Sequence, residues 1–380
     1  MRNNVIKLLN ILFKYLTDNT DEKPSQNIIP CLKEVSLFLR KRGINHILQI
    51  YPVVKKNNHA NLIAFNPKLK GPFVLFQGHI DTVPSANFSK PKINSKTISG
   101  RGAVDMKGAL AGMINAFISL YKDSSVLKYP PALLITGDEE ANSFAGIKNF
   151  LKLNAKFPVL LAINGEPSNF EVQTFFRGVL GYVLEKKGEE KHSAYPGKNL
   201  LIEEMAPVIQ FIIEFLDKSR KIKDKNLGQT IGAITTINSG VKDNQMPEFF
   251  RMSFNLRTVK PNMIYKKLFN KIVSSKIHKE EGIKIKSFGF NPTKSNVPQE
   301  IKKIIKKSFK DANIKYKEST TTFFTETSLM NMKNIPTIIL GPGNPKLSHM
   351  DPKKEIIKIR DIKRYSKLLK AIVKSINEKL

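Results

Sequence analysis

A histidine and a carboxylate two positions apart directly follow an apolar run early in the chain. Residues 73–76 read Phe-Val-Leu-Phe, and the segment Gly-His-Ile-Asp-Thr-Val-Pro at 78–84 then supplies His79 and Asp81. A short unbroken apolar run is typical of a parallel strand that is covered on both faces. In open α/β sheets, ligands bind beyond the carboxyl ends of such strands. We therefore expect His79 and Asp81 to lie at a binding site.

Three later apolar runs lead into acidic residues or histidine in the same way. The side chains that follow the runs at 132–136, 159–163 and 336–340 are, in that order, Glu139 with Glu140, Glu166, and His349. Taken singly, each could be a solvated loop residue, as most charged side chains are. The repeated placement at strand ends indicates one shared site.

Asp105 lies in a glycine-rich turn, Gly-Arg-Gly-Ala-Val-Asp-Met-Lys-Gly at 100–108, that precedes a helix extending to about Tyr121. Glycines allow the backbone to approach a ligand closely. Cys31 is the only cysteine, so an internal disulfide and a thiolate metal site are both excluded. Any metal must be held by His, Asp and Glu.

Length and composition predict two domains, because 380 residues with 41% hydrophobic content exceed the usual size of one domain. No stretch approaches the roughly 20 consecutive apolar residues that cross a bilayer. Residues 1–16 are interrupted by Lys7, Asn10 and Lys14, and no signal-peptide cleavage site follows. We expect an amphipathic first helix in a cytoplasmic protein that has no membrane partner.

The formal net charge is +31, from 63 basic and 32 acidic residues, which would suit a polyanionic partner. The lysines are scattered, they outnumber the arginines, and they do not alternate with aromatic residues as a base-stacking surface requires. We expect no specific nucleic-acid partner, only salt-sensitive incidental affinity. A basic nucleic-acid-binding protein remains the alternative from another class.

The pattern of residues 178–290 differs from the α/β pattern on either side. It predicts strands at 179–186, 231–239, 249–259 and 283–290 and helices at 200–216 and 263–278. Their order, β-α-β-β-α-β, is ferredoxin-like. We therefore predict a catalytic domain in two parts, 1–177 and 291–380, interrupted by an inserted domain at 178–290.

Five motifs together carry a resemblance to a known family. They are Gly-His-Ile-Asp-Thr-Val-Pro at 78–84, Gly-Arg-Gly-Ala-Val-Asp-Met-Lys-Gly at 100–108, Gly-Asp-Glu-Glu at 137–140, Gly-Glu-Pro at 165–167 and His-Ser-Ala-Tyr-Pro at 192–196. They resemble those of di-zinc amidohydrolases such as acetylornithine deacetylase, acetyl-lysine deacetylase and succinyl-diaminopimelate desuccinylase, with aminoacylases and carboxypeptidases as relatives. The resemblance implies a zinc-peptidase-like α/β domain with a mostly parallel central sheet and a ferredoxin-like dimerisation (lid) domain.

The resemblance also implies a role for each matching residue of the metal site. Asp105 would bridge two zinc ions, for which cobalt would substitute. His79 and Glu166 would complete one zinc site, and Glu140 and His349 the other. Asp81 would hold the ring of His79. Glu139 would be the general base, although the Glu-Glu pair alone does not say which residue binds metal.

Four further residues carry roles that the resemblance implies. His192 would stabilise the oxyanion of the tetrahedral intermediate from the partner subunit of a homodimer. Arg257 and Asn244 would hold the substrate carboxylate, which suits a guanidinium fork. Thr325 is a further substrate-binding candidate, next to Glu326.

The substrate would be a small N-acyl amino acid. The Thr325-Glu326 pair resembles the acetylornithine and acetyl-lysine deacetylases, which indicates a role in arginine or lysine biosynthesis. Succinyl-diaminopimelate desuccinylase and a small-dipeptide metallocarboxypeptidase remain alternatives.

Overall fold

The structure is a computed structural model that describes residues 2–20, 22–53, 57–85, 90–141, 143–153, 157–198, 200–277 and 282–380. The chain forms two compact units. Unit 1 comprises the chain up to Thr174, Ser295–Ser319 and Thr325–Leu380, and unit 2 comprises Phe175–Lys294 and Thr320–Phe324.

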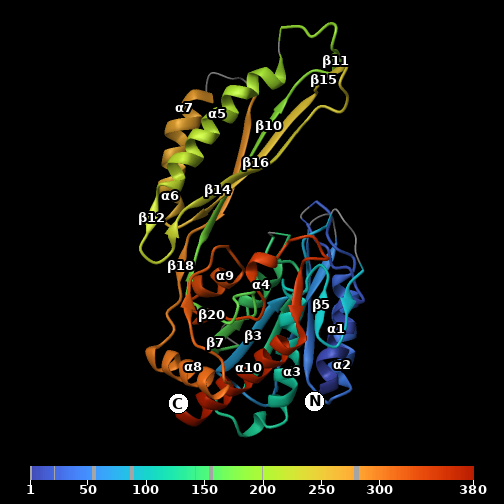
Figure 1. Cartoon of the computed structure of the whole chain (residues 1–380), viewed down its shortest axis with the longest axis vertical. Coiled ribbons are helices and arrows are strands. Elements are labelled where there is room, and N and C mark those ends of the chain that lie inside the picture. The colour runs from blue at the N-terminus through green and yellow to red at the C-terminus, as the bar shows by residue number, and fades with distance from the viewer. Residues whose placement is uncertain are drawn as a thin grey trace. The chain divides into compact units, whose positions relative to one another are not determined.

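Unit 1 is built on an eight-stranded sheet with the order β1-β2-β6-β3-β7-β20-β8-β19 (Figure 1). The strands are β1 (His46–Pro52), β2 (Asn58–Ala64), β3 (Phe73–His79), β6 (Pro131–Thr136), β7 (Val159–Asn164), β8 (Val172–Gln173), β19 (Glu318–Ser319) and β20 (Thr337–Ile339). The four neighbours β6, β3, β7 and β20 are parallel. Every residue of β3 and β6 is buried, as the continuous apolar runs predict. The prediction of a mostly parallel α/β sheet is confirmed.

Helices cover this sheet. They are α1 (Arg2–Phe13), α2 (Ile28–Arg40), α3 (Lys107–Tyr121), α4 (Ala145–Leu151), α8 (Gln299–Asp311), α9 (Thr327–Met332) and α10 (Ile359–Lys379). Nearly all of α3 is buried, because it contacts β3, β6 and α1 and also packs against α10. A helix that is apolar all round is expected in such a central position.

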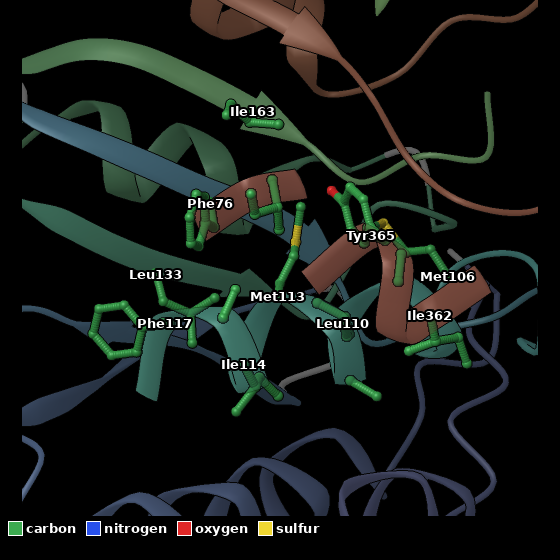
Figure 2. Packing of buried hydrophobic residues seen from close by; sticks show 14 of the residues in the cluster. Phe76, Met106, Leu110, Met113, Ile114, Phe117, Leu133, Ile163, Ile362 and Tyr365 are labelled. Atoms are coloured by element: carbon green, nitrogen blue, oxygen red, sulfur yellow. The ribbon is translucent and has the colours of Figure 1, made fainter. Parts of the chain in front are cut away.

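Figure 2 shows how α3 fills the core of unit 1. Leu110, Met113 and Phe117 of α3 pack in one buried cluster with strand residues and with residues of α10. The strand residues labelled there are Phe76, Leu133 and Ile163, and those of α10 are Ile362 and Tyr365. Met106 belongs to the same cluster and directly follows Asp105, so the core reaches the predicted site.

A small three-stranded sheet, order β21-β5-β4, joins distant parts of unit 1. It consists of β4 (Lys92–Ile93), β5 (Thr97–Ser99) and β21 (Ile356–Lys358). The antiparallel pairing of β21 with β5 brings the C-terminal segment beside the glycine-rich turn. The sequence patterns did not predict this sheet, because strands of two or three residues have no recognisable periodicity.

Unit 2 has an antiparallel sheet with the order β14-β16-β10-β17. Its main elements are β10 (Gly178–Lys187), α5 (Leu201–Arg220), β14 (Ile231–Ser239), β16 (Phe249–Thr258), α6 (Asn262–Phe269) and β17 (Lys284–Phe290). This is the expected β-α-β-β-α-β order. The predicted second helix extends to His278, which lies outside the described residues. Burial alternates strictly along β16, because one face of the sheet packs against α5 and the other does not.

None of the helices in the described part of the chain combines the length and apolar character that a membrane span requires.

Candidate active site

The carboxyl ends of four adjacent parallel strands deliver the predicted metal ligands. His79 is the last residue of β3, and Glu166 follows β7 by two residues. Glu139 and Glu140 follow β6, and His349 follows β20. Asp105 lies in the turn before α3. The strand order places these ends side by side, so that residues far apart in the chain meet.

The first cluster consists of His79, Asp105 and Glu166. The Nε2 atom of His79 lies 3.1 Å from Asp105 Oδ1 and 3.4 Å from Glu166 Oε1. The other ring nitrogen, Nδ1, lies 3.0 Å from the carbonyl oxygen of Asp81. A proton on Nδ1 would be donated to that carbonyl, which leaves Nε2 free to bind a metal.

The second cluster consists of Asp105, Glu140 and His349. The Nε2 atom of His349 lies 3.4 Å from Asp105 Oδ2 and 3.1 Å from Glu140 Oε1. The two oxygens of Asp105 therefore face different histidines. A carboxylate in this position can contribute one oxygen to each of two metal ions.

The spacing within both clusters fits a tetrahedral zinc site. Bonds of about 2.0–2.1 Å place neighbouring ligand atoms about 3.3–3.4 Å apart. The four histidine-to-carboxylate distances lie between 3.1 and 3.4 Å. Glu139 also lies close to His79 and Glu140, so this grouping by itself does not exclude it as a ligand.

The histidines of the cluster strongly retain protons when only protein atoms surround them. Burial alone would lower the pKa of His349, but hydrogen bonds to Asp105 and Glu140 outweigh burial and raise it to about 11. At His79, burial likewise acts to lower the pKa, while hydrogen bonds to Asp105, Asp81 and Glu166 raise it well above its ordinary value. Divalent cations would replace such protons, because metal ligands must be deprotonated.

Burial and nearby negative charges raise the pKa values of two glutamates in the clusters. Burial, followed by the nearby charge of Asp105, raises the pKa of Glu166 to about 7. Burial also raises the pKa of Glu139 well above its ordinary value, and Glu166, Glu140 and Glu326 add to the effect. Buried carboxylates this close together are stabilised by cations, so the donor set fits two divalent ions.

Asp81 connects the histidine of one cluster to the loop that carries both glutamates. Its Oδ1 lies 3.4 Å from His79 Nδ1 and accepts the backbone N–H of Glu139 at 3.2 Å. Its Oδ2 accepts the backbone N–H of Glu140 at 2.9 Å and the side chain of Asn19 at 3.0 Å. Asp81 is fully buried and orients these neighbours.

Sequence reasoning missed Asn19 and gave no role to Asp138. Asn19 comes from the segment after α1, through a bridge between Asp18 and Thr82. The carboxylate of Asp138 accepts hydrogen bonds from Tyr51, Ser143, Ala145 and Gly146, and thereby ties the glutamate loop to the start of α4. The position of Asp138 beside Glu139 was a usable signal. Asn19 offered none, because nothing in its local sequence indicates its distant partner.

Thr325 and Glu326 lie buried just before α9. The hydroxyl of Thr325 accepts the N–H of Thr327 at 3.1 Å. Glu326 accepts hydrogen bonds from Thr136 at 2.6 Å and from Gln77, which lies two residues before His79. Burial raises the pKa of Glu326 to about 8. Glu326 thus contacts β3 and the end of β6, the two strands that lead to His79 and to the glutamate pair.

The remaining predicted residues belong to unit 2. His192 is exposed in the short strand β11 (Lys191–His192), which pairs with β15 (Gln245–Met246). The N–H of Ser193 donates to the carbonyl oxygen of Asn244 at 3.0 Å, so His192 and Asn244 lie close together. Arg257 lies in β16, between Val179 of β10 and Ile231 of β14.

A mostly parallel sheet with two histidine–carboxylate clusters at its strand ends is suited to metal-dependent hydrolysis. The chain belongs to peptidase family M20/M25/M40, whose family model matches residues 75–375. It is therefore an enzyme of the amidohydrolase and peptidase type.

Several known proteins are similar to this chain. The acetylornithine deacetylase of Buchnera aphidicola subsp. Schizaphis graminum is 27% identical, and the match covers 87% of each chain. The succinyl-diaminopimelate desuccinylase of Pelagibacter ubique is 28% identical, over 84% of this chain and 85% of that protein. An M20 family metallo-carboxypeptidase from Sulfolobus solfataricus has the same fold, with a TM-score of 0.77, 17% identity and coverage of 98% and 99%.

Proposed function

We propose that the chain is a di-zinc amidohydrolase that removes the acyl group from N-acetylornithine or N-acetyl-lysine. The observation that carries this proposal is Asp105, whose two oxygens lie 3.1 and 3.4 Å from the Nε2 atoms of two different histidines. The similarity to an acetylornithine deacetylase along most of both chains supports the acetylated substrate. The proposal includes a role in arginine or lysine biosynthesis in the cytoplasm.

His79, Asp105 and Glu166 would hold one zinc ion, and Asp105, Glu140 and His349 the other. When bound, the two ions would polarise the amide carbonyl and acidify a water molecule. Cobalt prefers similar ligands and would replace zinc. The carbonyl of Asp81 would keep His79 in the tautomer that binds metal, and Asn19 would hold Asp81 in place.

Glu139 would be the group that moves the proton. Asp81 accepts the backbone N–H groups of both glutamates, so these bonds do not distinguish them. Glu140 Oε1 lies 3.1 Å from His349 Nε2, and we therefore assign Glu140 to the metal and Glu139 to the proton. The side-chain carboxylate of Glu139 would take a proton from water as the water oxygen attacks the amide carbon. The same carboxyl would then give the proton to the amine when the C–N bond breaks. Burial raises the pKa of Glu139, which makes its carboxylate a stronger base for the first step.

Residues of unit 2 would complete the site, and one of them, His192, would come from the partner of a homodimer. The partner's His192 would stabilise the oxyanion, and Asn244 and Arg257 would hold the substrate carboxylate. Support comes from the matching motif at 192–196 and from the proximity of His192 and Asn244 in the β11–β15 pair. Thr325 would contact the substrate from unit 1.

A second candidate activity is desuccinylation of N-succinyl-diaminopimelate, which the similarity to the Pelagibacter ubique enzyme favours. The proposed site chemistry would serve this reaction equally well, because only the acyl group and the amine differ. A small-dipeptide carboxypeptidase activity is a third candidate, and the fold shared with a metallo-carboxypeptidase is consistent with it.

Substrate profiling of the zinc-loaded protein tests the proposal. Acetylornithine, acetyl-lysine, succinyl-diaminopimelate and small dipeptides are compared by kcat/KM, and a Glu139→Gln variant purified in parallel measures contaminating host activity. We expect the largest kcat/KM for an acetylated diamino acid. Activity confined to the succinylated substrate or to dipeptides would contradict the proposed substrate.

A further inference from the structure

Glu355 is a buried carboxylate that is bound to the turn carrying Asp105. It lies directly before β21, is 0% exposed, and is separated by 250 residues from Asp105. A fully buried carboxylate is costly unless several donors satisfy it. Glu355 therefore depends on the groups that surround it.

Those groups all belong to the glycine-rich turn. Oε1 of Glu355 accepts the backbone N–H groups of Gly102 at 2.9 Å, Val104 at 3.1 Å and Asp105 at 3.4 Å. Oε2 accepts the guanidinium of Arg101 at 2.5 Å. Converging backbone N–H groups of this kind form an anion-binding nest. Here the anion is a side chain of the same protein.

The backbone of Glu355 holds the turn as well. Its carbonyl oxygen accepts the N–H of Gly100 at 3.1 Å, so both ends of the segment 100–105 are attached to one residue. Gly102 has φ of 87°, a conformation that favours glycine and helps its N–H to point into the nest.

The same C-terminal segment also carries a proposed ligand. The N–H of Glu355 donates to the carbonyl of Asp351 at 3.1 Å, in a turn that starts two residues after His349. The short segment 349–355 thus holds His349 at one end and the turn of Asp105 at the other. A shift of either end would alter the distance of 3.4 Å between His349 Nε2 and Asp105 Oδ2.

We propose that Glu355 is a positioning residue that sets the place of Asp105 and thereby controls the affinity of both metal positions. This inference rests on the proposed two-metal function. Because Asp105 belongs to both clusters, its displacement weakens both metals together, whereas loss of any other ligand weakens mainly one. A purely structural role for Glu355 would lower the stability of the metal-free protein and leave metal affinity unchanged.

The test is zinc titration of the metal-free full chain against a chromophoric chelator, together with the visible spectrum of the cobalt-loaded protein. For Glu355→Ala we expect both dissociation constants to rise about 10- to 100-fold, as when other groups that orient metal ligands are lost. The cobalt spectrum should change because the ligand geometry changes. For Glu355→Gln we expect a smaller rise, because the amide oxygen still accepts the backbone N–H groups.

A matched control is Asp224→Asn in unit 2. Asp224 accepts two backbone N–H groups, from Asn226 at 2.8 Å and Leu227 at 3.1 Å, and a lysine at 2.9 Å, but it lies outside the metal cluster. This variant should bind zinc like the wild type.

Three outcomes decide the matter. A folded Glu355→Ala protein with unchanged dissociation constants would overturn the role of Glu355. If that variant does not fold, wild-type zinc affinity and cobalt spectrum in Glu355→Gln would overturn it. A wild-type protein that binds no metal would refute the proposed two-metal function, and the role of Glu355 with it.

Discussion

Glu139 and Glu140 are adjacent in the chain but have different surroundings. Glu140 contacts His349, while burial, with a smaller effect of neighbouring carboxyl groups, raises the pKa of Glu139. Glu139→Gln should therefore retain zinc and lose turnover by roughly a hundredfold to ten-thousandfold, because only the proton carrier is removed. Glu140→Gln should lose one zinc ion. Metal content and kcat measured on the same samples check both. Full activity of metal-loaded Glu139→Gln would contradict its role as the base.

Glu326 provides a pH prediction for the metal-free protein. Burial raises its pKa from 4.5 to about 8, so the folded chain retains a proton that the unfolded chain releases. The stability of the wild type should therefore fall, relative to Glu326→Gln, as the pH rises from about 4.5 to about 8, by no more than about 1.4 kcal/mol per pH unit. Thermal unfolding of both proteins across this range measures the difference. A difference that does not change with pH would contradict the prediction.

Some residues near the site could be predicted from sequence and others could not. The structure brings together four residues that the sequence singles out, His79, Glu140, Glu166 and His349. Each follows an apolar run, and such a run is typical of a buried strand. Asn19 and Glu355 were not found. They reach the site through contacts across 62 residues with Asp81 and 250 residues with Asp105, and no local pattern records such distant contacts.

The segments that follow the neighbouring strands β20 and β7 are closely packed. A Cβ atom added at Gly341, just after β20, would overlap the backbone carbonyl oxygens of Gly165 and Glu166. Gly341→Ala should therefore move the backbone at Glu166, lower stability by about 1–3 kcal/mol, and weaken zinc binding.

Thermal unfolding and zinc affinity test this prediction. The matched control is Gly232→Ala in unit 2, where the added Cβ atom would meet the flexible end of Leu216 at 3.0 Å. Equal zinc affinity in Gly341→Ala and the wild type would show that the strand ends tolerate the displacement.

Long elements were predictable and short ones were not. The spans of β16 and α3 follow from periodicity over many residues, and the observed ends agree within a few positions. The two-residue strands β8 and β19 and the short helix α9 exist because tertiary contacts stabilise them. Their sequences are too short to show a period.

In the proposed homodimer, unit 1 of one chain would hold the metal ions and unit 2 of its partner would supply His192. If the partner's His192 completes the site, His192→Ala should retain zinc and lose turnover by about a hundredfold or more, as removal of an oxyanion donor typically does. Mixing it with Glu139→Gln should restore partial activity, because one site of the mixed dimer then has both groups intact. Activity is measured before and after subunit exchange. Verified exchange without recovery would count against a shared site.

The domain boundaries at 178 and 290, the homodimer and the absence of a specific nucleic-acid partner remain predictions. Dimerisation and nucleic-acid binding depend on surfaces that contact other molecules, and the sequence of one chain does not show which molecule a surface contacts. The fold class was more accessible, because strand-and-helix order alone distinguishes a parallel α/β sheet from an antiparallel insert.

The metal content of the zinc-reconstituted chain tests the central claim most directly. Five protein ligands with Asp105 shared between two clusters exceed the needs of one tetrahedral ion, so we predict two zinc ions per chain. Elemental analysis after removal of free zinc gives the number, and Asp105→Ala should bring it close to zero. A wild-type chain that saturates at one zinc ion or binds none would contradict the account.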